Sequence, residues 1–480
     1  MRKGMVNKMQ QCVLGIDLGT SSVKIIKKYR DGHIEKLKNT YNVPLPRGWW
    51  EAISELLEKI DWNEVSAIGL SSQVGTYLVN EKEVIGWNQN VGKDELRWWK
   101  KHYPAEIFIR EISMPHPDII SYPLPRLKYI REHFEKIETV CQPKEYLIKQ
   151  LTGEWVTDAY SWRGLANLEN AEYSEFFLKE LGIEKEKLPP IKKYDEVAGY
   201  TKQMVLGANM LPAGIPVFVG LNDYYAGLLG MGVGKKGQMF DLTGTSEHLG
   251  VIQEEMVKDT SLVSGPYITN MVHYGVTGSG GPSIKYGLKL INQLYRSSGK
   301  AETENLTELD LGKIRKEKPP IFLPYLKGER APIWNPDARG VFFGIEETTS
   351  VEQMAYAVME GVAFSLYHIY ETMGKPDVKK ITVSGGAAEI KMLNILKAEI
   401  FDCDIEVAEE SDVSALGACM VAAVGKGMYP SYAKAAEKWV KVSDKVEPSG
   451  AYRDWFMKRF ELYKELYESV QLLYERWKEM

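Results

Sequence analysis

Residues 15–25 read GIDLGTSSVKI, and residues 240–251, almost half a chain later, read FDLTGTSEHLGV. Each segment is an apolar stretch that ends in Asp, followed by a tight turn of Gly, Thr and Ser and then by a second apolar stretch. A turn of small residues leaves several backbone N–H groups and hydroxyls unblocked, and concave rows of such donors bind phosphate oxygens well. The repeat therefore predicts a phosphate-bearing ligand held between two duplicated domains.

The composition is typical of a cytoplasmic protein with several domains. The 480 residues are enough for two or three domains, and 44% hydrophobic residues suffice for a sizeable core in each. The formal net charge of -5 offers no general attraction for nucleic acid or an anionic membrane. The four cysteines form no Cys-x-x-Cys pair, and no apolar run reaches the roughly 20 residues needed to cross a bilayer. We expect a reduced, cytoplasmic protein with neither nucleic acid nor membrane as partner.

The order of the expected elements indicates an α/β protein. Residues 12–18 and 23–29 are expected to form two neighbouring strands, and residues 30–33 after them a hairpin turn with the Asp-Gly signature. Helical periodicity over residues 51–60 and an apolar strand over 65–70 follow. Residues 124–190 are predicted to be rich in helix, and residues 452–480 to form an amphipathic helix packed on the body.

Asp223 is the strongest candidate for a reactive side chain. It ends the segment VFVGLND at residues 217–223, and the small residues of AGLLGMGVG at 226–234 follow it. A strand end that opens onto a Gly-rich helix is where α/β proteins usually place reactive groups. The alternative is that Asp223 caps the N-terminus of this helix, a role for which Asp is also favoured.

Together these segments resemble the FGGY carbohydrate kinases, which belong to the superfamily of sugar kinases, actin and heat-shock chaperone ATPases. Residues 322–332 (FLPYLKGERAP) and 338–344 (ARGVFFG) are nearly identical to a family signature, although their mechanistic role stays open. The resemblance implies an α/β fold of two ribonuclease-H-like (actin-like ATPase) domains with an interdomain cleft. We expect the first domain over residues 12–238, the second over 239–430 and a helical tail over 431–480.

The resemblance implies that small residues in several turns bind ATP. The side chains and glycines concerned are Thr20, Ser21 and Ser22, then Gly244, Thr245 and Ser246, then Gly278 and Gly281, and finally Gly385, Gly386 and Ala387. The first two groups are expected to contact the γ-phosphate from opposite sides. The third is as well explained by a flexible loop from composition alone, and the fourth lets adenosine lie against backbone without a Cβ clash. Glu389 and Ile390 depart from the residues expected after the adenosine glycines.

The resemblance makes Asp223 the general base and Asp17 a ligand of Mg²⁺, bound directly or through water. Asp before Gly is also common in turns, which is the structural alternative for Asp17. Gln73, Asn88 and Asn222 are expected to contact the substrate together with Asp223, because amides both donate and accept hydrogen bonds. Gln73 and Asn88 are explained equally well as polar caps of a strand and a turn.

The implied activity is transfer of the γ-phosphoryl group of ATP to a hydroxyl of a small sugar or polyol, with a xylulose-like ketose as the expected class. Xylulose kinases carry His after the residue matching Gln73 and an acid at the position of Gln89, and this sequence has neither. The alternative is an actin-like or chaperone-like nucleotide switch that acts on a protein. The Asp223 motif and the helix-rich middle favour the kinase. A homodimer is an open alternative to a monomer.

Overall fold

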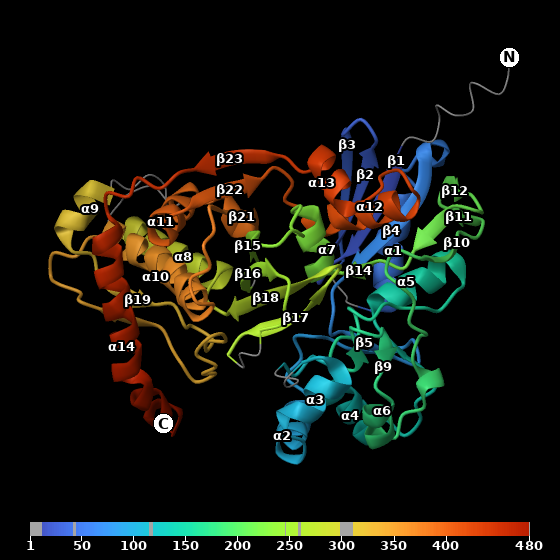
Figure 1. Ribbon diagram of the computed structural model, residues 1–480, viewed down its shortest axis with the longest axis horizontal. Coiled ribbons are helices and arrows are strands. Elements are labelled where there is room, and N and C mark those ends of the chain that lie inside the picture. Colours follow the sequence, from blue (N-terminus) through green and yellow to red (C-terminus); the bar gives the residue numbers. More distant parts are fainter. Residues whose placement is uncertain are drawn as a thin grey trace. The chain divides into compact units, whose positions relative to one another are not determined.

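The computed structural model describes residues 12–41, 45–114, 119–244, 246–257, 261–297 and 311–479. The chain forms two compact units (Figure 1), namely Met1–Gly232 with Asp412–Val440, and Val233–Ser411 with Lys441–Met480. Helix α12 (Val413–Gly425) thus belongs by its contacts to the first unit, although its sequence lies within the segment 239–430.

The first unit is built on a mixed sheet with the strand order β10-β13-β4-β1-β2-β3, and β14 also pairs with β4. Its strands are β1 (Cys12–Leu18), β2 (Ser22–Tyr29), β3 (Ile34–Thr40), β4 (Val65–Ser72), β10 (Val197–Tyr200), β13 (Pro216–Phe218) and β14 (Leu221–Asn222). β1 and β2 form an antiparallel hairpin, while β4 runs parallel to β1. The expected strands at residues 12–18, 23–29 and 65–70 are confirmed.

Helices cover both faces of this sheet. They are α12 with α7 (Asp223–Gly230) on one face, and α1 (Pro46–Leu57) with α5 (Pro143–Thr152) on the other. α12 lies very close to the strands: a Cβ on Gly15 would be 2.1 Å from the carbonyl oxygen of Ala415, and one on Gly69 would be 1.9 Å from that of Ala418. These two glycines are therefore required for the helix to approach β1 and β4.

A second core of the first unit lies among its short helices. These helices are α2 (Lys93–His102), α3 (Ala105–Ile112), α4 (Pro123–His133) and α6 (Glu175–Leu181), and α13 (Tyr432–Trp439) packs on α7 and α12. The remaining strands are β5 (Tyr77–Val79), β6 (Glu83–Ile85), β7 (Val140–Cys141), β8 (Ala166–Asn167), β9 (Glu172–Tyr173), β11 (Met204–Leu206) and β12 (Asn209–Leu211). Residues 124–190 are rich in helix, as predicted, and their strands are only two residues long.

The second unit repeats the hairpin-plus-parallel-strand topology. Its sheet has the order β17 (Val263–Tyr267), β18 (Asn270–Thr277), β16 (Glu247–Gln253), β15 (Met239–Thr243), β21 (Lys380–Gly385), β22 (Asp404–Ala408) and β23 (Val442–Val446). β15 and β16 are antiparallel and β21 runs parallel to β15, just as β4 runs parallel to β1. β19 (Ile321–Leu323) and β20 (Val341–Phe343) form a separate pair. The sequence repeat is thus a repeat of structure.

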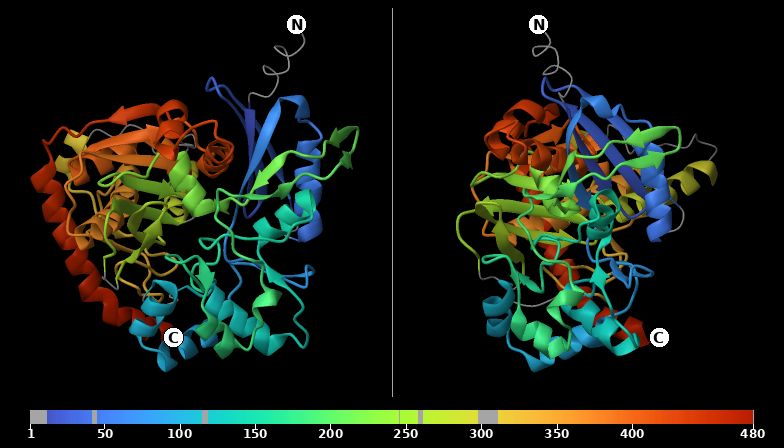
Figure 2. Two further views of the ribbon diagram at one scale, coloured as in Figure 1. Left: turned by 45° about the vertical axis from the view of Figure 1, so that its right-hand side comes forward. Right: turned by 90° about the vertical axis from the view of Figure 1, so that its right-hand side faces the viewer.

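The helices of the second unit are α8 (Gly281–Ser297), α9 (Leu311–Glu317), α10 (Val351–Thr372), α11 (Lys391–Phe401) and α14 (Arg453–Glu479). α14 packs along α10, α11 and β19 (Figure 2), and it buries Phe456, Phe460 and Tyr463. The hydroxyls of Tyr463 and Tyr325 are 2.5 Å apart. The expected amphipathic helix at residues 452–480 therefore exists and packs on its own unit.

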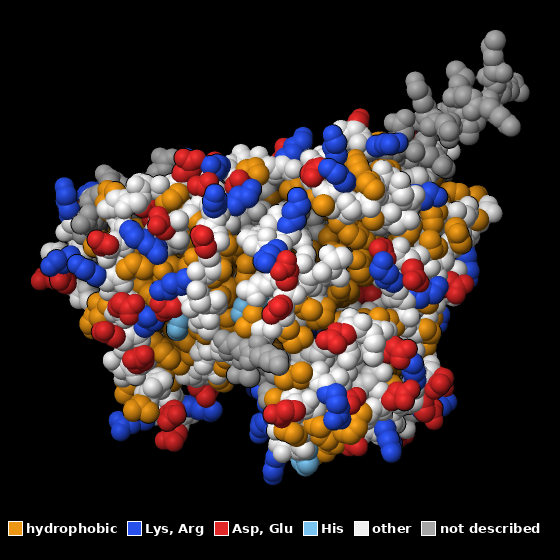
Figure 3. Space-filling view, in the orientation of Figure 1, with side chains coloured by type: hydrophobic (Ala, Val, Ile, Leu, Met, Phe, Trp, Pro, Cys, Tyr) orange, Lys and Arg blue, Asp and Glu red, His pale blue; other side chains and the backbone are white. Residues whose placement is uncertain are grey.

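On the face drawn in Figure 3, acidic and basic side chains are interspersed and neither sign gathers into one patch. Within the part of the chain that the structure describes, no helix combines the length and the apolar character needed to span a bilayer.

Candidate active site

The carboxyl ends of three adjacent strands bring the candidate residues of the first unit together. Asp17 on β1 and Leu221 on β14 are both register partners of Ser71 on β4. Since all three strands run parallel, Asp17 and the residues that follow Leu221 emerge at the same edge of the sheet. Two residues after Leu221 the chain reaches Asp223, so the predicted base and the predicted metal ligand lie near each other.

Asp223 is the first residue of α7, and the residue that caps this helix is Asn222. The side-chain oxygen of Asn222 accepts from the N–H of Tyr225 at 3.1 Å, and its amide donates to the carbonyl of Tyr160 at 3.0 Å. The capping role considered for Asp223 is therefore filled by its neighbour. Asp223 as a residue is partly exposed, and its carboxylate accepts from the N–H of Tyr224 at 2.9 Å.

The surroundings of Asp223 favour its protonated form more than bulk water does. Burial is the largest cause that raises the pKa of Asp223, to about 7, and the negative charge of Asp17 adds to the rise. Close to neutral pH both protonation states of Asp223 are therefore populated, which is the condition under which a carboxylate works best as a general base.

Asp17 is buried, with 7% of its surface exposed. The hydroxyl of Ser71 donates to its Oδ1 at 2.9 Å. Burial raises the pKa of Asp17, while the Ser71 hydroxyl and Lys24 oppose the rise, and Lys24 is itself paired with Asp412 at 2.7 Å. An uncharged hydroxyl does not neutralise a carboxylate as an ammonium group would, and hard oxygen ligands of this kind suit Mg²⁺.

A buried lysine that the sequence did not predict as a site residue binds the backbone shortly before Asp223. Lys144 on α5 donates to the carbonyls of Val219 at 3.2 Å and Gly220 at 3.3 Å, and it pairs with Asp158. Lys144 and Asp158 are each only 1% exposed. No local signal in the sequence identifies this pair, because its function depends on a strand far along the chain.

The first phosphate loop is closed by a hydrogen bond from the N–H of Gly19 to the carbonyl of Ser22 at 3.0 Å. Thr20 and Ser21 are exposed at the tip of this turn. The indole N–H of Trp87 donates to the hydroxyl of Thr20 at 3.0 Å, so the predicted phosphate loop and the predicted substrate segment are joined directly.

The predicted substrate amides differ in their settings. Gln73 is buried, its backbone N–H donates to the carbonyl of Leu18 at 2.9 Å, and its side-chain oxygen accepts from Thr76 at 3.4 Å. Asn88 is exposed in a turn. Both are in the first unit, on the segments that follow β4 and β6.

The turn that carries Asn88 is held by Arg126, which sequence reasoning missed. The fully buried Arg126 donates through one nitrogen to the carbonyls of Gly86, Trp87 and Gln89, at 3.2, 3.2 and 2.9 Å. Burial lowers the pKa of Arg126. A guanidinium that gathers three carbonyls fixes the path of the turn, so Arg126 positions the segment.

In the second unit the predicted adenosine segment and the second phosphate loop are in contact. The N–H of Ala387 donates to the hydroxyl of Thr243 at 2.9 Å. Gly385 has a φ of +99°, and a Cβ there would lie 1.9 Å from the carbonyl oxygen of Thr243, so only glycine fits. Gly386 is exposed beside it. Thr245 lies outside the described residues.

The family-like segment at 322–332 connects the other two nucleotide segments of this unit. Glu329 is buried and accepts from the hydroxyl of Thr277 at 2.8 Å, from the N–H of Gly278 at 2.7 Å and from the hydroxyl of Ser279. Its neighbour Arg330 donates to the hydroxyl of Ser246 at 3.1 Å.

The Gly-rich segment lies directly against the second loop, because a Cβ on Gly281 would be 2.8 Å from the carbonyl oxygen of Gly244. The predicted nucleotide residues of the second unit that the structure describes thus belong to one connected region.

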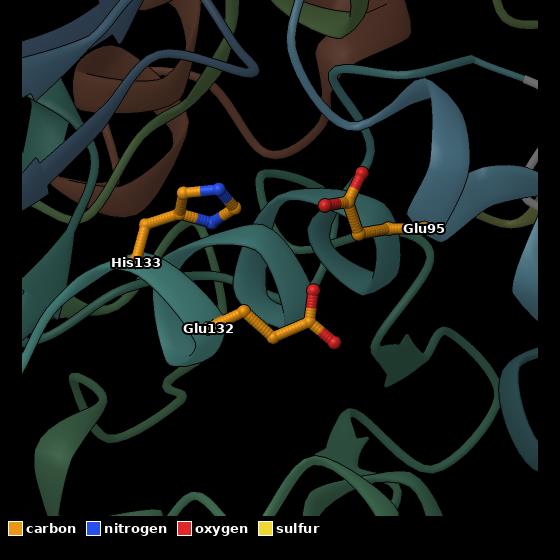
Figure 4. A group of neighbouring side chains, drawn as sticks. All are labelled: Glu95, Glu132 and His133. Atoms are coloured by element: carbon orange, nitrogen blue, oxygen red, sulfur yellow. The ribbon is translucent and has the colours of Figure 1, made fainter.

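One other cluster of titratable groups lies on α2 and α4, where Glu95, Glu132 and His133 have ligand atoms within 4.8 Å of one another (Figure 4). Glu132 is paired with Lys128 at 2.6 Å. The ring of His133 stacks on Tyr129, and its Nδ1 is 2.9 Å from the Tyr129 carbonyl oxygen. These contacts account for both exposed side chains, and we assign the cluster no function.

Comparisons with known proteins cover nearly the whole chain. The family model for "FGGY family of carbohydrate kinases, N-terminal domain" matches residues 12–230, and the one for its C-terminal domain matches residues 242–425. A xylulose kinase of Staphylococcus epidermidis is 26% identical over 97% of this chain and 98% of its own length.

Two solved structures are similar over the same span. The gluconate kinase of Lactobacillus acidophilus matches with a TM-score of 0.83 and 24% identity, over 97% of this chain and 99% of that one. The glycerol kinase of Plasmodium falciparum, solved with ADP, matches with a TM-score of 0.79 and 17% identity, over 96% and 98%. These matches confirm the predicted fold class of two ribonuclease-H-like α/β domains, while the similar proteins differ in the acceptor that their names give.

Proposed function

The chain belongs to the FGGY family of carbohydrate kinases, and we propose that it transfers the γ-phosphoryl group of ATP to a primary hydroxyl of a small sugar of the xylulose-like ketose class. The observation that carries this proposal is the position of Asp223. Its carboxylate lies at the aligned strand ends near Asp17, and the helix is capped by Asn222 and not by Asp223. Burial raises the pKa of Asp223 to about 7. A carboxylate at this place suits an acceptor hydroxyl, which favours the kinase over the nucleotide switch.

In the proposed reaction the ionised Asp223 accepts the proton of the acceptor hydroxyl as its oxygen bonds to the γ-phosphorus. The bond from this phosphorus to the bridging oxygen of ADP breaks in line, so the products are ADP, the sugar phosphate and the protonated base. Lys144 and the cap of Asn222 hold the base at a fixed place. Alignment of this kind is a large part of phosphoryl-transfer catalysis, because the protein contributes mainly positioning and charge.

Asp17 and Ser71 are the groups that would hold Mg²⁺ in the first unit. Their donor set fits the ion, since a carboxylate fixed by a neutral hydroxyl offers oxygen ligands and leaves room for waters and phosphates. The ion would supply positive charge against the phosphate oxygens. The loop of Thr20, Ser21 and Ser22 would add uncharged donors from the same unit.

Gln73 and Asn88 are the proposed acceptor contacts, and Asn222 adds its buried amide. Because Gln89 stands where an acid is expected, the segment offers fewer ionisable groups to a substrate. A hydroxyl buried without a partner costs about 1–3 kcal/mol, which lowers kcat/KM by one or two orders of magnitude. We therefore expect a related sugar or polyol to be preferred over D-xylulose.

A substrate screen tests the activity. Purified protein is incubated with ATP, Mg²⁺ and a panel of ketoses, polyols and sugar acids, and ADP release is measured. At least one acceptor is expected to raise ADP release well above the rate without acceptor, and D-xylulose is not expected to lead the panel. A wide margin in favour of D-xylulose would contradict the specificity argument, and no stimulation by any acceptor would contradict the kinase.

The role of the base is tested with Asp223→Asn, using Asp31→Asn in an exposed turn as the matched control. Loss of a general base is expected to lower kcat by about 10²- to 10⁴-fold with little change in nucleotide or sugar affinity. The control is expected to retain its activity. Near-normal turnover in folded Asp223→Asn would remove Asp223 from the chemical step.

A further inference from the structure

Three buried charged groups enclose the second phosphate loop at its base. Asp241 lies on β15 just before the loop, and Glu247 is the first residue of β16 just after it. Lys397, on α11, reaches both: its Nζ is 2.5 Å from Oδ2 of Asp241 and 2.7 Å from Oε1 of Glu247. The three side chains are at most 2% exposed. One ammonium group thus pairs with a carboxylate on the strand before the loop and with a carboxylate on the strand after it.

The cluster contains two carboxylates but only one ammonium group. Oδ1 of Asp241 and Oε2 of Glu247 have no hydrogen-bond partner among the described residues. With both carboxylates ionised and Lys397 charged, the cluster would carry a net charge of about -1 away from water, which is costly. A single proton makes it neutral. Burial, more than any other cause, raises the pKa of Asp241 to about 7; Lys397 opposes this rise and Glu247 adds to it.

This cluster lies within the region that the proposed nucleotide must use. Oε2 of Glu247 would be 2.8 Å from a Cβ on Gly280, so it borders the Gly-rich segment. Lys397 belongs to the helix that follows the predicted adenosine segment at Gly385 and Gly386. A change in the charge of the cluster therefore changes the electrostatic potential at the loop, whose proposed ligand is a phosphate anion.

On the basis of the proposed function, we propose that Asp241, Glu247 and Lys397 are positioning residues that hold one shared proton and thereby keep the second phosphate loop able to bind nucleotide. In the protonated state the neutral cluster ties the two ends of the loop together. Loss of the proton sets two carboxylates against each other and places a net negative charge beside the phosphates. Nucleotide affinity then falls as the pH rises.

The neighbouring charged groups do not account for such a change. The pKa of His248, on the same strand as Glu247, is lowered to about 4 by burial first and by Arg330 second, so His248 is neutral over the range of interest. Arg330 stays charged and donates to Ser246. Burial raises the pKa of Glu329, and its hydrogen bonds from Ser279 and Gly278 oppose the rise.

The test compares pH profiles of ADP binding. The dissociation constant of ADP with Mg²⁺ is measured by calorimetry between pH 6.0 and 8.5 for the unmodified protein, for Asp241→Asn and for the exposed control Asp444→Asn. The titration of ADP itself is common to all three and cancels. Binding linked to one proton weakens at most tenfold per pH unit above the pKa. The ratio of the dissociation constants at pH 8.5 and 6.0 is expected to be about 3- to 30-fold larger in the unmodified protein than in Asp241→Asn.

Asp444→Asn is expected to follow the unmodified protein. Glu247→Gln likewise leaves one carboxylate with one ammonium group, so it is expected to behave like Asp241→Asn and replaces that variant if Asp241→Asn does not fold. A merely structural role would lower affinity equally at all pH values. Profiles that agree within twofold, with ADP bound normally, would overturn the proton-sharing cluster alone. A protein that binds no ADP at any pH would overturn both this proposal and the kinase.

Discussion

Replacement of Gly220 by Ala should disturb the catalytic carboxylate through the backbone. Gly220 joins β13 to β14 with a φ of +78°, and a Cβ there would lie only 2.0 Å from the carbonyl oxygen of Leu70 on β4. Two costs therefore apply. An L-residue in the left-handed region costs about 1–2 kcal/mol, and the clash with a fixed strand adds about 1–3 kcal/mol because the strand or the turn must move.

Gly214 provides the matched control. It also has a positive φ, of +94°, but nothing lies within 4 Å of the Cβ that Ala would add. Gly214→Ala should therefore carry only the first cost. In urea unfolding followed by tryptophan fluorescence, Gly220→Ala is expected to lose about 1–3 kcal/mol more of the free energy of unfolding than Gly214→Ala.

The functional effect should separate the two variants further. Lys144 donates to the carbonyl of Gly220, and Asp223 follows three residues later. A displaced turn misplaces the base, and a misplacement of about 1 Å can cost on the order of 10²-fold in rate. We expect kcat to fall at least tenfold in Gly220→Ala and to stay nearly unchanged in Gly214→Ala. Equal stability and equal kcat in the two variants would refute the reasoning.

Two further predictions concern charged side chains. Burial raises the pKa of Asp223 to about 7, and the base must be ionised to accept a proton. The kcat should therefore rise about tenfold per pH unit below pH 7 and level off above it. A kcat that stays constant between pH 5.5 and 7 would contradict this. Lys144→Met leaves the carboxylate of Asp158 buried without its cation and should cost about 3–5 kcal/mol in chemical denaturation. Lys149→Met, which removes a partly exposed pair with Glu81, should cost about 1 kcal/mol or less, and similar losses in both variants would show that burial of the pair is unimportant.

The elements that carry the two phosphate loops can be predicted from the sequence because their signals are local. An apolar run, a turn of small residues and a second apolar run identify β1 with β2, and β15 with β16, without any knowledge of the rest of the chain. The position of Asp223 after a strand is a signal of the same kind. The sequence does not predict which residue caps the helix. Two adjacent polar residues, Asn222 and Asp223, could each cap it, and only the backbone geometry selects Asn222.

The supporting residues cannot be predicted in this way. Lys144, Arg126 and Lys397 are single basic residues in helices, where a solvated position is the ordinary expectation. Each becomes significant through carbonyls or carboxylates that lie far from it in the sequence. The same holds for α12, whose packing on β1 and β4 depends on the long-range approach that Gly15 permits.

The two copies of the hairpin show how packing separates the functions of residues that the sequence makes equivalent. Asp17 and Asp241 occupy the same place before their loops, yet Asp17 accepts from the neutral hydroxyl of Ser71 and Asp241 is paired with the ammonium of Lys397. A divalent cation approaching Asp241 would be repelled by the ammonium of Lys397, which is already paired with that carboxylate. Near Asp17, by contrast, Lys24 is paired with the carboxylate of Asp412. The asymmetry between the copies thus follows from one lysine on a distant helix, and it supports the proposal that the first copy serves a metal ion.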